Sequence, residues 1–243
     1  MASLDIVPVP VLSDNYVWLL RDEATGAVAV VDPGEAPPVE AALAARGWAP
    51  ALILLTHHHG DHVGGVAALK AAYGAAVIGA AADAHRLPAL DRAVSPGETI
   101  AVGECQALVI DTPGHTRGHI AYHFAEAGVL ACGDTLFSLG CGRMFEGSAE
   151  EFFAALQRLA ALPDETLVLC GHEYTQANAR FALTVEPDNA ALRARAAEIE
   201  AQRAAGRPTL PVTLGAEKAA NPFLRAPDVA RFAALRAAKD SFR

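Results

Sequence analysis

The chain has 243 residues, of which 52% are hydrophobic, and a formal net charge of −9. This length and apolar content suffice for one large domain, alone or with a small addition, and for a sizeable core. The acidic balance disfavours nucleic acid as a partner, and no apolar run reaches the roughly 18–20 residues that a membrane-spanning helix needs.

The N-terminus and the cysteines indicate a cytoplasmic protein. The segment MASLDIVPVPVLSDNY has no basic region followed by an apolar one, so we expect no secretory signal. The four cysteines form no CxxC pair, and without an export signal a disulfide framework is not expected. We therefore expect a soluble cytoplasmic protein with reduced thiols.

Short β segments and helices alternate through the first 115 residues. Apolar or alternating runs between turn residues predict strands within 4–11, 15–22, 27–34, 51–55 and 75–80, and two more within 98–115. Alanine-rich and leucine-rich segments predict helices at 36–47 and 62–74. Two prolines in the first run favour an edge strand.

A hairpin, a helix and a last strand are expected next. Residues 119–124 and 128–137 read as two strands turned at AEAG. The segment SAEEFFAALQRLAAL is typical of an amphipathic helix, and Ser148 and Glu151 have the spacing of a capping box. The run ETLVLCGHEY, residues 165–174, predicts the last strand.

Beyond residue 173 the pattern is helical, with no clear strand, so we expect two domains, 1–173 and 174–243. The charge is also uneven: residues 1–189 carry 9 basic and 23 acidic side chains, a net −14, while 190–243 carry 10 and 5, a net +5. Two solvated surfaces of different sign explain this asymmetry. A basic tail that faces an acidic substrate, or the body of the protein, explains it equally well.

Four of the nine histidines stand together in LILLTHHHGDHVGG, directly after a predicted strand. Residues two apart in an extended segment point the same way, so His57 and His59 can face one ion. Asp61 and His62, in the turn that opens the next helix, can face a second. Five potential ligands this close do not suit one tetrahedral ion, so two ions are the more natural interpretation.

Three further candidate ligands end predicted strands, each directly after a glycine: His115, Asp134 and His172. Taken singly, each is more often an ordinary polar or turn residue than a ligand. Taken together with the HxHxDH cluster, they predict a two-metal site.

The motif THHHGDH, followed in order by those three residues, resembles the metallo-β-lactamase superfamily. The segments VDPG, TPGHTRGHI, GDTLF, GCGR, GHEYT, VEPDN, NPFLR and LRAAKD extend the resemblance over nearly the whole chain. The metal motif is specific only to the superfamily, whereas GHEYT, NPFLR and the terminal RxxKD are typical of its glyoxalase II (hydroxyacylglutathione hydrolase) branch. The resemblance implies an α+β fold: a four-layer αβ/βα metallo-β-lactamase sandwich followed by a small C-terminal α-helical domain.

The resemblance also implies a ligand set. The first metal is expected on His57, His59 and His115, and the second on Asp61, His62 and His172, with Asp134 bridging both. His58 falls between ligands and is expected to point away from the metals. Asp32, in VVDPG, is expected either to orient a ligand histidine or to start a turn before Pro33.

The activity implied is hydrolysis of a thioester. Two ions about 3.5–4 Å apart lower the pKa of a shared water, so the expected nucleophile is a metal-bridging hydroxide, oriented by the ligands Asp61 and Asp134. The implied substrate is an S-(2-hydroxyacyl)glutathione, above all S-D-lactoylglutathione, and the products are glutathione and D-lactate, in methylglyoxal detoxification. Zinc is the expected metal, with iron and manganese as alternatives that suit the same ligands.

The two carboxylates of glutathione call for donors and positive charge. By the resemblance, the substrate-binding residues are Arg143, Tyr174, Arg236 and Lys239. Arg236 and Lys239 share a helix face, where a merely solvated charged face is the alternative. If they bind the carboxylates, Arg236→Ala raises KM with kcat nearly intact. The chain departs from the family at Phe145, where many members have a tyrosine that donates to glutathione.

Three other functions fit parts of the pattern. A persulfide dioxygenase shares the scaffold but uses one iron, and is expected to lack the helical C-terminal domain and the complete second ligand set. A β-lactamase is expected to be exported. A metal-binding or scaffold protein without chemistry is expected to have lost ligands, whereas all seven are present. We therefore expect a monomeric hydrolase that contacts neither nucleic acid nor membranes.

Overall fold

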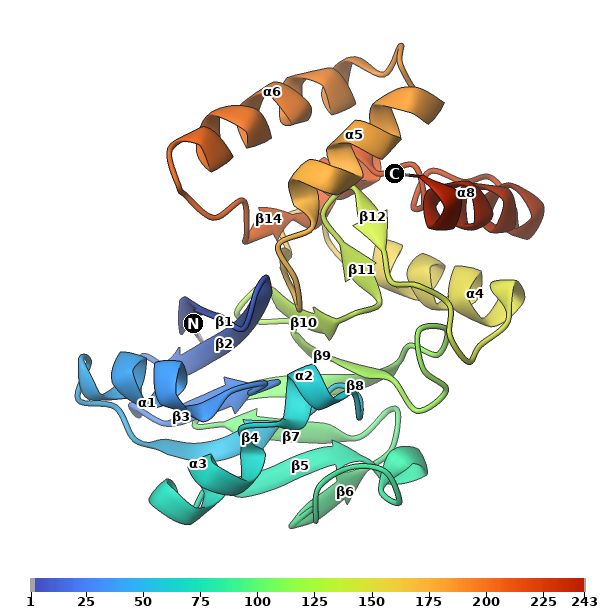
Figure 1. Cartoon of the computed structure of the whole chain (residues 1–243). Coiled ribbons are helices and arrows are strands. Elements are labelled where there is room, and N and C mark those ends of the chain that lie inside the picture. Colours follow the sequence, from blue (N-terminus) through green and yellow to red (C-terminus); the bar gives the residue numbers. More distant parts are fainter. Residues whose placement is uncertain (1–2, 243) are drawn as a thin grey trace. The chain divides into compact units, whose positions relative to one another are not determined.

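The computed structural model describes residues 3–242 (Figure 1). The chain forms two compact units, one of Met1–Asp111 with Gly118–Gly133, the other of Thr112–Arg117 with Asp134–Arg243. In the described part of the chain, every helix is too short or too polar to cross a membrane.

A six-stranded sheet in chain order opens the first unit. Its strands are β1 (Leu4–Val11), β2 (Asn15–Asp22), β3 (Val28–Val31), β4 (Pro50–Leu54), β5 (Ala76–Ala80) and β6 (Arg92–Val94). The first three strands pair antiparallel, and β3 to β6 run parallel. The proline-containing β1 lies at the edge of the sheet, as its composition predicts, because proline has no N–H for a second neighbour.

Helices connect the parallel strands and cover one face of this sheet (Figure 1). They are α1 (Ala36–Ala44), α2 (Gly60–Val63) and α3 (Val66–Tyr73), and the short 3₁₀ turn η1 (Ala81–Asp83) precedes β6. Leu43 of α1 and Leu69 of α3 share one core with strand residues such as Val30 and Ile53. Strands β3 to β5 are nearly continuous apolar runs because helices and a second sheet bury both faces.

The helix predicted over 62–74 is in fact two helices, and the break falls at Gly64 and Gly65. A Cβ atom at Gly64 would meet the carbonyl of Gly34, and one at Gly65 would meet the backbone of Glu35. The glycines therefore let the turn after β3 approach closely, and this contact interrupts the helix.

An antiparallel array completes the first unit, in the order β10-β9-β8-β7. Its strands are β7 (Thr99–Val102), β8 (Cys105–Asp111), β9 (Ile120–Phe124) and β10 (Val129–Gly133). The strands β9 and β10 form the hairpin predicted around AEAG. The Tyr122 hydroxyl of β9 donates to the carbonyl of Leu55 at 3.0 Å, which ties this array to the end of β4.

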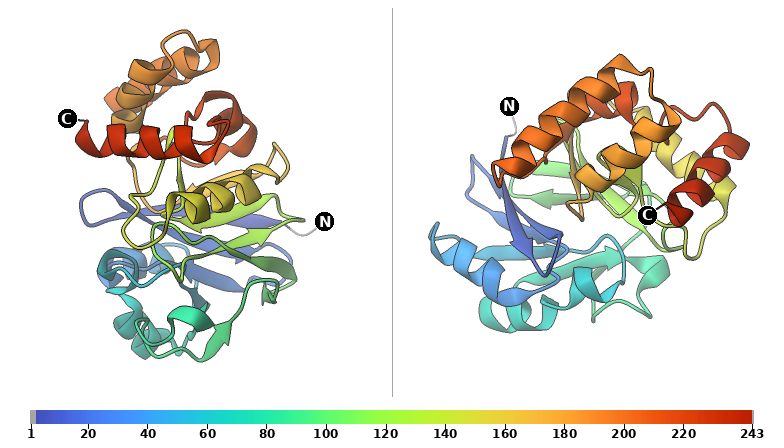
Figure 2. Two further views of the ribbon diagram at one scale, coloured as in Figure 1. Left: turned by 90° about the vertical axis from the view of Figure 1, so that its right-hand side faces the viewer. Right: turned by 45° about the horizontal axis from the view of Figure 1, so that its top comes forward.

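Helices dominate the second unit. They are α4 (Ala149–Ala160), α5 (Thr175–Val185), α6 (Ala190–Ala204), α7 (Leu214–Ala220) and α8 (Val229–Ser241), with short strands β11 (Leu136–Phe137), β12 (Gly140–Cys141), β13 (Leu167–Cys170) and β14 (Val212–Thr213). Figure 2 shows α5 packed on α6 (orange) and α8 (red) alongside α4 (yellow). The rings of Phe152 and Phe232, 5.6 Å apart, join α4 to α8. The capping box of Ser148 and Glu151 is present, as predicted.

One short element corrects the prediction for residues 174–243. The stretch without a predicted strand contains β14, which pairs antiparallel with β13, whereas the helix α7 agrees with the predicted helical pattern. Two residues are too few to show an alternating pattern, and β14 gains its ladder partners from a strand some 45 positions earlier. The sequence signal for β14 is therefore absent at short range.

Candidate metal centre

The parallel strands of the first sheet bring polar side chains to one edge. Asp32 directly follows β3, Thr56 and His57 follow β4, and Asp83 follows β5. Because the carboxyl ends of parallel strands meet at the same edge, these residues gather there although they are far apart in the sequence. The short helix α2 then presents Asp61 and His62 from its single turn.

Asp32 supports the first part of the site through its carboxylate. Its Oδ1 accepts the Thr56 N–H at 2.8 Å, and its Oδ2 accepts the Thr56 hydroxyl at 2.6 Å and lies 3.1 Å from His62 Nδ1. Asp32 also has a φ of +50°, so it starts a tight turn before Pro33 as well. With Nδ1 held by Asp32, the other nitrogen of His62 faces Asp61, whose Oδ2 is 3.6 Å away.

His57 and His59 present nitrogen atoms to each other. Nε2 of His57 lies 3.1 Å from Nδ1 of His59. Atoms that bind one tetrahedral ion at about 2.0–2.2 Å are roughly 3.3–3.6 Å apart, so this slightly shorter separation is close to that of two ligands on one ion. The ring of His57 is fixed by Thr56, whose Oγ1 is 3.0 Å from Nδ1, and by His119, which stacks at 4.8 Å.

Within the second unit, a carboxylate lies between two imidazoles. Oδ2 of Asp134 lies 3.5 Å from Nε2 of His115 and 3.3 Å from Nε2 of His172. All three side chains are buried. Both separations again match those of neighbouring ligands on an ion, so one oxygen is suited to coordination shared with either histidine. Tyr174 stacks on His172 with centroids 4.5 Å apart and planes 6° from parallel.

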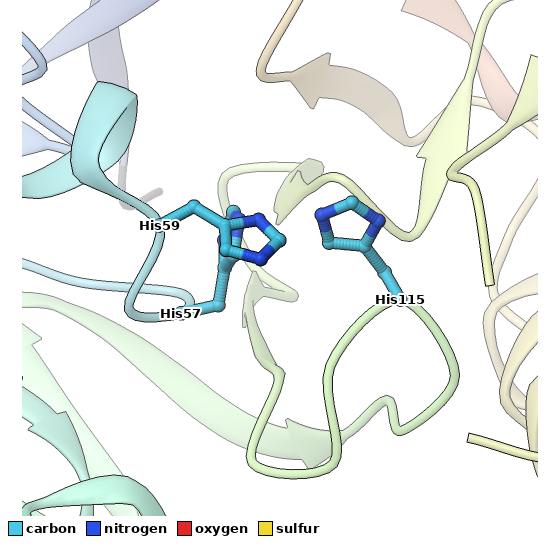
Figure 3. Close-up of side chains that lie close together, drawn as sticks. All are labelled: His57, His59 and His115. Atoms are coloured by element: carbon cyan, nitrogen blue, oxygen red, sulfur yellow. The ribbon is translucent and has the colours of Figure 1, made fainter. Parts of the chain in front are cut away.

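Three groups of side chains have ligand atoms that all lie within 4.8 Å of one another: His57 with His59 and His115, Asp32 with His57 and His62, and Asp61 with His62 and His172. Figure 3 shows the first group, with His115 facing the other two rings. Such His and Asp clusters suit metal ions.

The remaining histidines do not belong to these groups. His58 Nδ1 lies 2.8 Å from Oδ2 of the buried Asp83, which also accepts from Arg86 at 2.6 Å. His85 is exposed in a turn. Burial lowers the pKa of His123, so that side chain is neutral in the second sheet at physiological pH.

Arg236 and Arg143 both lie beside Asp240 of α8, but Arg236 is buried and Arg143 is exposed. Arg236 is only 6% exposed, and its Nη1 donates to the carbonyls of Cys141 at 2.9 Å and Gly142 at 3.3 Å. The Arg143 side chain is 58% exposed, with its Nε 3.4 Å from Oδ1 of Asp240. The same oxygen accepts from Nη2 of Arg236 at 2.9 Å.

Lys239, Tyr174 and Phe145 are the other residues that the sequence relates to substrate binding. The Lys239 Nζ donates to the Ala177 carbonyl at 3.3 Å, and burial and the neighbouring Arg236 charge lower its pKa. Tyr174 is 37% exposed and Phe145 is 59% exposed. The Phe145 ring lies 5.3 Å from that of His115, and the Arg143 guanidinium stands over it at 5.9 Å.

Several supporting residues were not predicted. Asn15, at the start of β2, donates to Asp61 Oδ2 at 2.9 Å, and Thr56 and Asp240 have the contacts given above. The spacing of Arg236 and Asp240 within LRAAKD, four residues apart on a helix, is a signal that predicts their ion pair. Asn15 carries no such signal, because its SDNY context is also typical of a turn.

Two family models match adjoining parts of the chain. Residues 12–172 match a model described as the metallo-beta-lactamase superfamily, and residues 173–242 match one described as the hydroxyacylglutathione hydrolase C-terminus. A hydroxyacylglutathione hydrolase from Rhodospirillum rubrum is 60% identical over 93% of this chain and 88% of its own length. One from Methylococcus capsulatus is 54% identical over 99% of both.

Solved structures share the fold. ETHE1 from Myxococcus xanthus covers 96% of this chain and 89% of its own, with a TM-score of 0.70 and 26% identity. TTHA1623, described in a di-iron-bound form, covers 89% and 99%, with a TM-score of 0.66 and 26% identity. The B3 metallo-β-lactamase BLEG-1, at 22% identity and a TM-score of 0.70 over 90% and 99%, shows likeness of fold alone. The predicted α+β sandwich with a helical C-terminal part is thereby confirmed.

Proposed function

The chain belongs to the metallo-β-lactamase superfamily and, within it, to the hydroxyacylglutathione hydrolases, and on this premise we propose that it converts S-D-lactoylglutathione and water to glutathione and D-lactate. Hydrolysis of a hydroxyacylglutathione thioester is the activity of the family. The observation that carries the proposal is the 60% identity over 93% of the chain, which includes the C-terminal part. We go further than the family's activity in proposing that the acyl group is lactoyl, and with it that the enzyme acts in methylglyoxal detoxification.

The proposal gives the two parts of the chain different tasks. Residues 1–173 form the catalytic domain, and residues 174–243 form a helical domain that binds the glutathione moiety. The boundary is supported by the two family models, which meet between residues 172 and 173. The second task is supported by the cationic side chains of α8.

Two divalent ions complete the proposed site. His57, His59 and His115 would hold the first, Asp61, His62 and His172 the second, and Asp134 both. The separations of 3.1–3.6 Å between neighbouring ligand atoms support this assignment. A relative of 26% identity has a di-iron-bound form. When bound, such ions supply Lewis acidity, which activates water and polarises a carbonyl. Zinc is the proposed metal, with iron and manganese as alternatives.

The chain's own residues hold and orient the reactants. Asp61 and Asp134 orient the attacking water, and Asp32 keeps the His62 ring in place. No side-chain nucleophile is required, and each of the four cysteines is buried. Arg143, Tyr174, Arg236 and Lys239 make the glutathione end of the site cationic and rich in donors. The proposal has the enzyme acting as a monomer in the cytoplasm, and the free cysteines support the cytoplasmic location.

The test is thioester hydrolysis by purified enzyme, followed through released glutathione. S-D-lactoylglutathione should be hydrolysed, and a chelator should abolish the activity until zinc is restored. Glutathione persulfide oxidation and β-lactam hydrolysis, assayed in parallel, should be absent. Activity that resists complete removal of metal, or persulfide oxidation that exceeds thioester hydrolysis, would overturn the proposal.

A further inference from the structure

One short segment, Cys141–Arg143, touches both the C-terminal helix α8 and the ligand candidate His115. On one side, Arg236 of α8 donates to the carbonyls of Cys141 and Gly142. On the other side, the carbonyl of Arg143 lies 2.8 Å from Nδ1 of His115. The segment therefore connects a side chain 121 positions later in the chain to the imidazole of His115.

The contact with Arg143 settles which nitrogen of His115 carries the proton. A carbonyl oxygen can only accept, so Nδ1 of His115 is the donor. In a neutral imidazole the lone pair is then on Nε2, the atom that lies 3.5 Å from Asp134 Oδ2. A hydrogen bond of this kind, from the outer nitrogen of a histidine to a backbone carbonyl, is the usual way to orient a metal ligand.

The segment is packed so tightly that its position has little freedom. A Cβ atom at Gly142 would overlap the carbonyl of Asp134 and press on Nδ1 of His115. Only glycine allows this approach. A small displacement of the segment must therefore move His115, Asp134 or both.

Arg236 is the side chain that fixes this segment from the α8 side. Its guanidinium is buried over the ring of Phe223, at 5.4 Å, and Asp240 offsets its charge. If Arg236 turned toward a substrate, the buried carbonyls of Cys141 and Gly142 would lose this donor. Loss of a buried hydrogen-bond partner costs about 1–3 kcal/mol for each group. The contacts thus favour a guanidinium that stays in place during catalysis.

We propose that Arg236 is a positioning residue for His115: it holds the Cys141–Arg143 segment, which sets the tautomer and orientation of the His115 ring. This inference rests on the proposed function, because it takes His115 as a metal ligand. It gives Arg236 the task of orienting a metal ligand, which is separate from binding a substrate carboxylate. The C-terminal helix then acts on the metal ligands as well as on glutathione.

The experiment compares Arg236→Ala with Arg231→Ala, which removes an exposed arginine from the same helix. Zinc affinity is measured by competition with a chelator, on the full-length protein. Arg236→Ala should lower zinc affinity about tenfold to a hundredfold, the range for loss of a group that orients a ligand, and Arg231→Ala should not change it. In the metal-free proteins, side-chain ¹⁵N shifts should report one His115 tautomer, protonated at Nδ1, in wild type and a mixture in Arg236→Ala.

The outcomes separate the inference from the proposed function. A wild-type protein that binds none of zinc, iron and manganese would overturn the proposed function itself. The positioning role is wrong if wild type binds zinc and Arg236→Ala has the same zinc affinity and the same ¹⁵N shifts of His115. A raised KM in that variant would then assign Arg236 to substrate binding alone. Should Arg236→Ala fail to fold, Arg236→Lys takes its place. That variant keeps the charge but not the paired donors, so it should lose zinc affinity to a smaller extent, and full retention would contradict the inference.

Discussion

The Asp32 carboxylate lies 3.1 Å from Nδ1 of His62, a residue 30 positions later in the chain. It also accepts two hydrogen bonds from Thr56, which stands directly before His57. One buried carboxylate therefore helps to position both the first and the last histidine of the HxHxDH motif, His57 and His62. Its φ of +50° is tolerated by Asp and Asn far better than by other residues.

Asp32→Asn and Asp32→Ala separate the two tasks of this residue. Asn keeps the backbone conformation and an acceptor but loses the negative charge, so zinc affinity should fall about 10–100-fold. Ala should lose that affinity and in addition lower the melting temperature well below that of the Asn variant, since it also removes the acceptors of Thr56. Chelator competition and thermal denaturation measure the two effects. Zinc affinity unchanged in Asp32→Asn would refute the orienting role.

Asp134→Ala should remove metal from both proposed positions. Its Oδ2 lies within 3.5 Å of His115 Nε2 and of His172 Nε2, so each ion would lose a ligand. We expect about two ions per chain in wild type, as in other two-metal sites, and well under one in the variant, with loss of thioesterase activity. Elemental analysis after dialysis measures the number of metal ions per chain. The control is His85→Ala, an exposed histidine outside the clusters, which should keep wild-type content.

The residues of the candidate site could be proposed from the sequence because the chemistry is concentrated in short motifs. His57, His59, Asp61 and His62 occupy six positions, and this spacing indicates a metal site before any fold is known. Asp32 was more ambiguous, since both a turn and an orienting carboxylate fit it. The structure has both features in the same residue.

The supporting contacts could not be predicted, because they join distant residues and often involve the backbone. The acceptors of Arg236 are carbonyls 95 and 94 positions away, and every residue type has a carbonyl. The same reason explains the missed strand β14, whose partner is distant. Periodicity reports the local chain only, whereas these contacts follow from tertiary packing.

Phe145 should affect KM through Arg143. The guanidinium stands over the Phe145 ring at 5.9 Å, within cation–π range, although both side chains are largely exposed. Such a contact is worth about 0.5–1 kcal/mol at an exposed site. Phe145→Leu should therefore raise KM for S-D-lactoylglutathione about two- to fivefold with kcat retained, while Phe145→Tyr should not.

A double-mutant cycle tests whether the effect passes through the arginine. In an Arg143→Ala background, Phe145→Leu should add little, because the cation is gone. Steady-state kinetics of the four proteins give the coupling. Full additivity of the two substitutions would show that Phe145 contacts the substrate independently of Arg143.

Glu217 should make stability depend on pH. Its side chain is fully buried, and it accepts from Ser138 Oγ and Leu139 N–H at 2.7 Å and from Asn221 Nδ2 at 3.0 Å. Burial raises its pKa above the ordinary 4.5, against the hydrogen bonds, which lower it. Between the two pKa values the folded state binds more protons than the unfolded state, so the free energy of unfolding falls as pH rises.

Glu217→Gln isolates this contribution, because glutamine is neutral at every pH and its other effects form a constant offset. The free energy of unfolding of wild type minus that of Glu217→Gln should be largest below pH 4.5. It should decrease as pH rises through the folded pKa and then level off. Denaturant titrations at several pH values measure this difference. A difference that stays constant or grows with pH would mean that the hydrogen bonds outweigh burial and keep Glu217 ionised in the folded state.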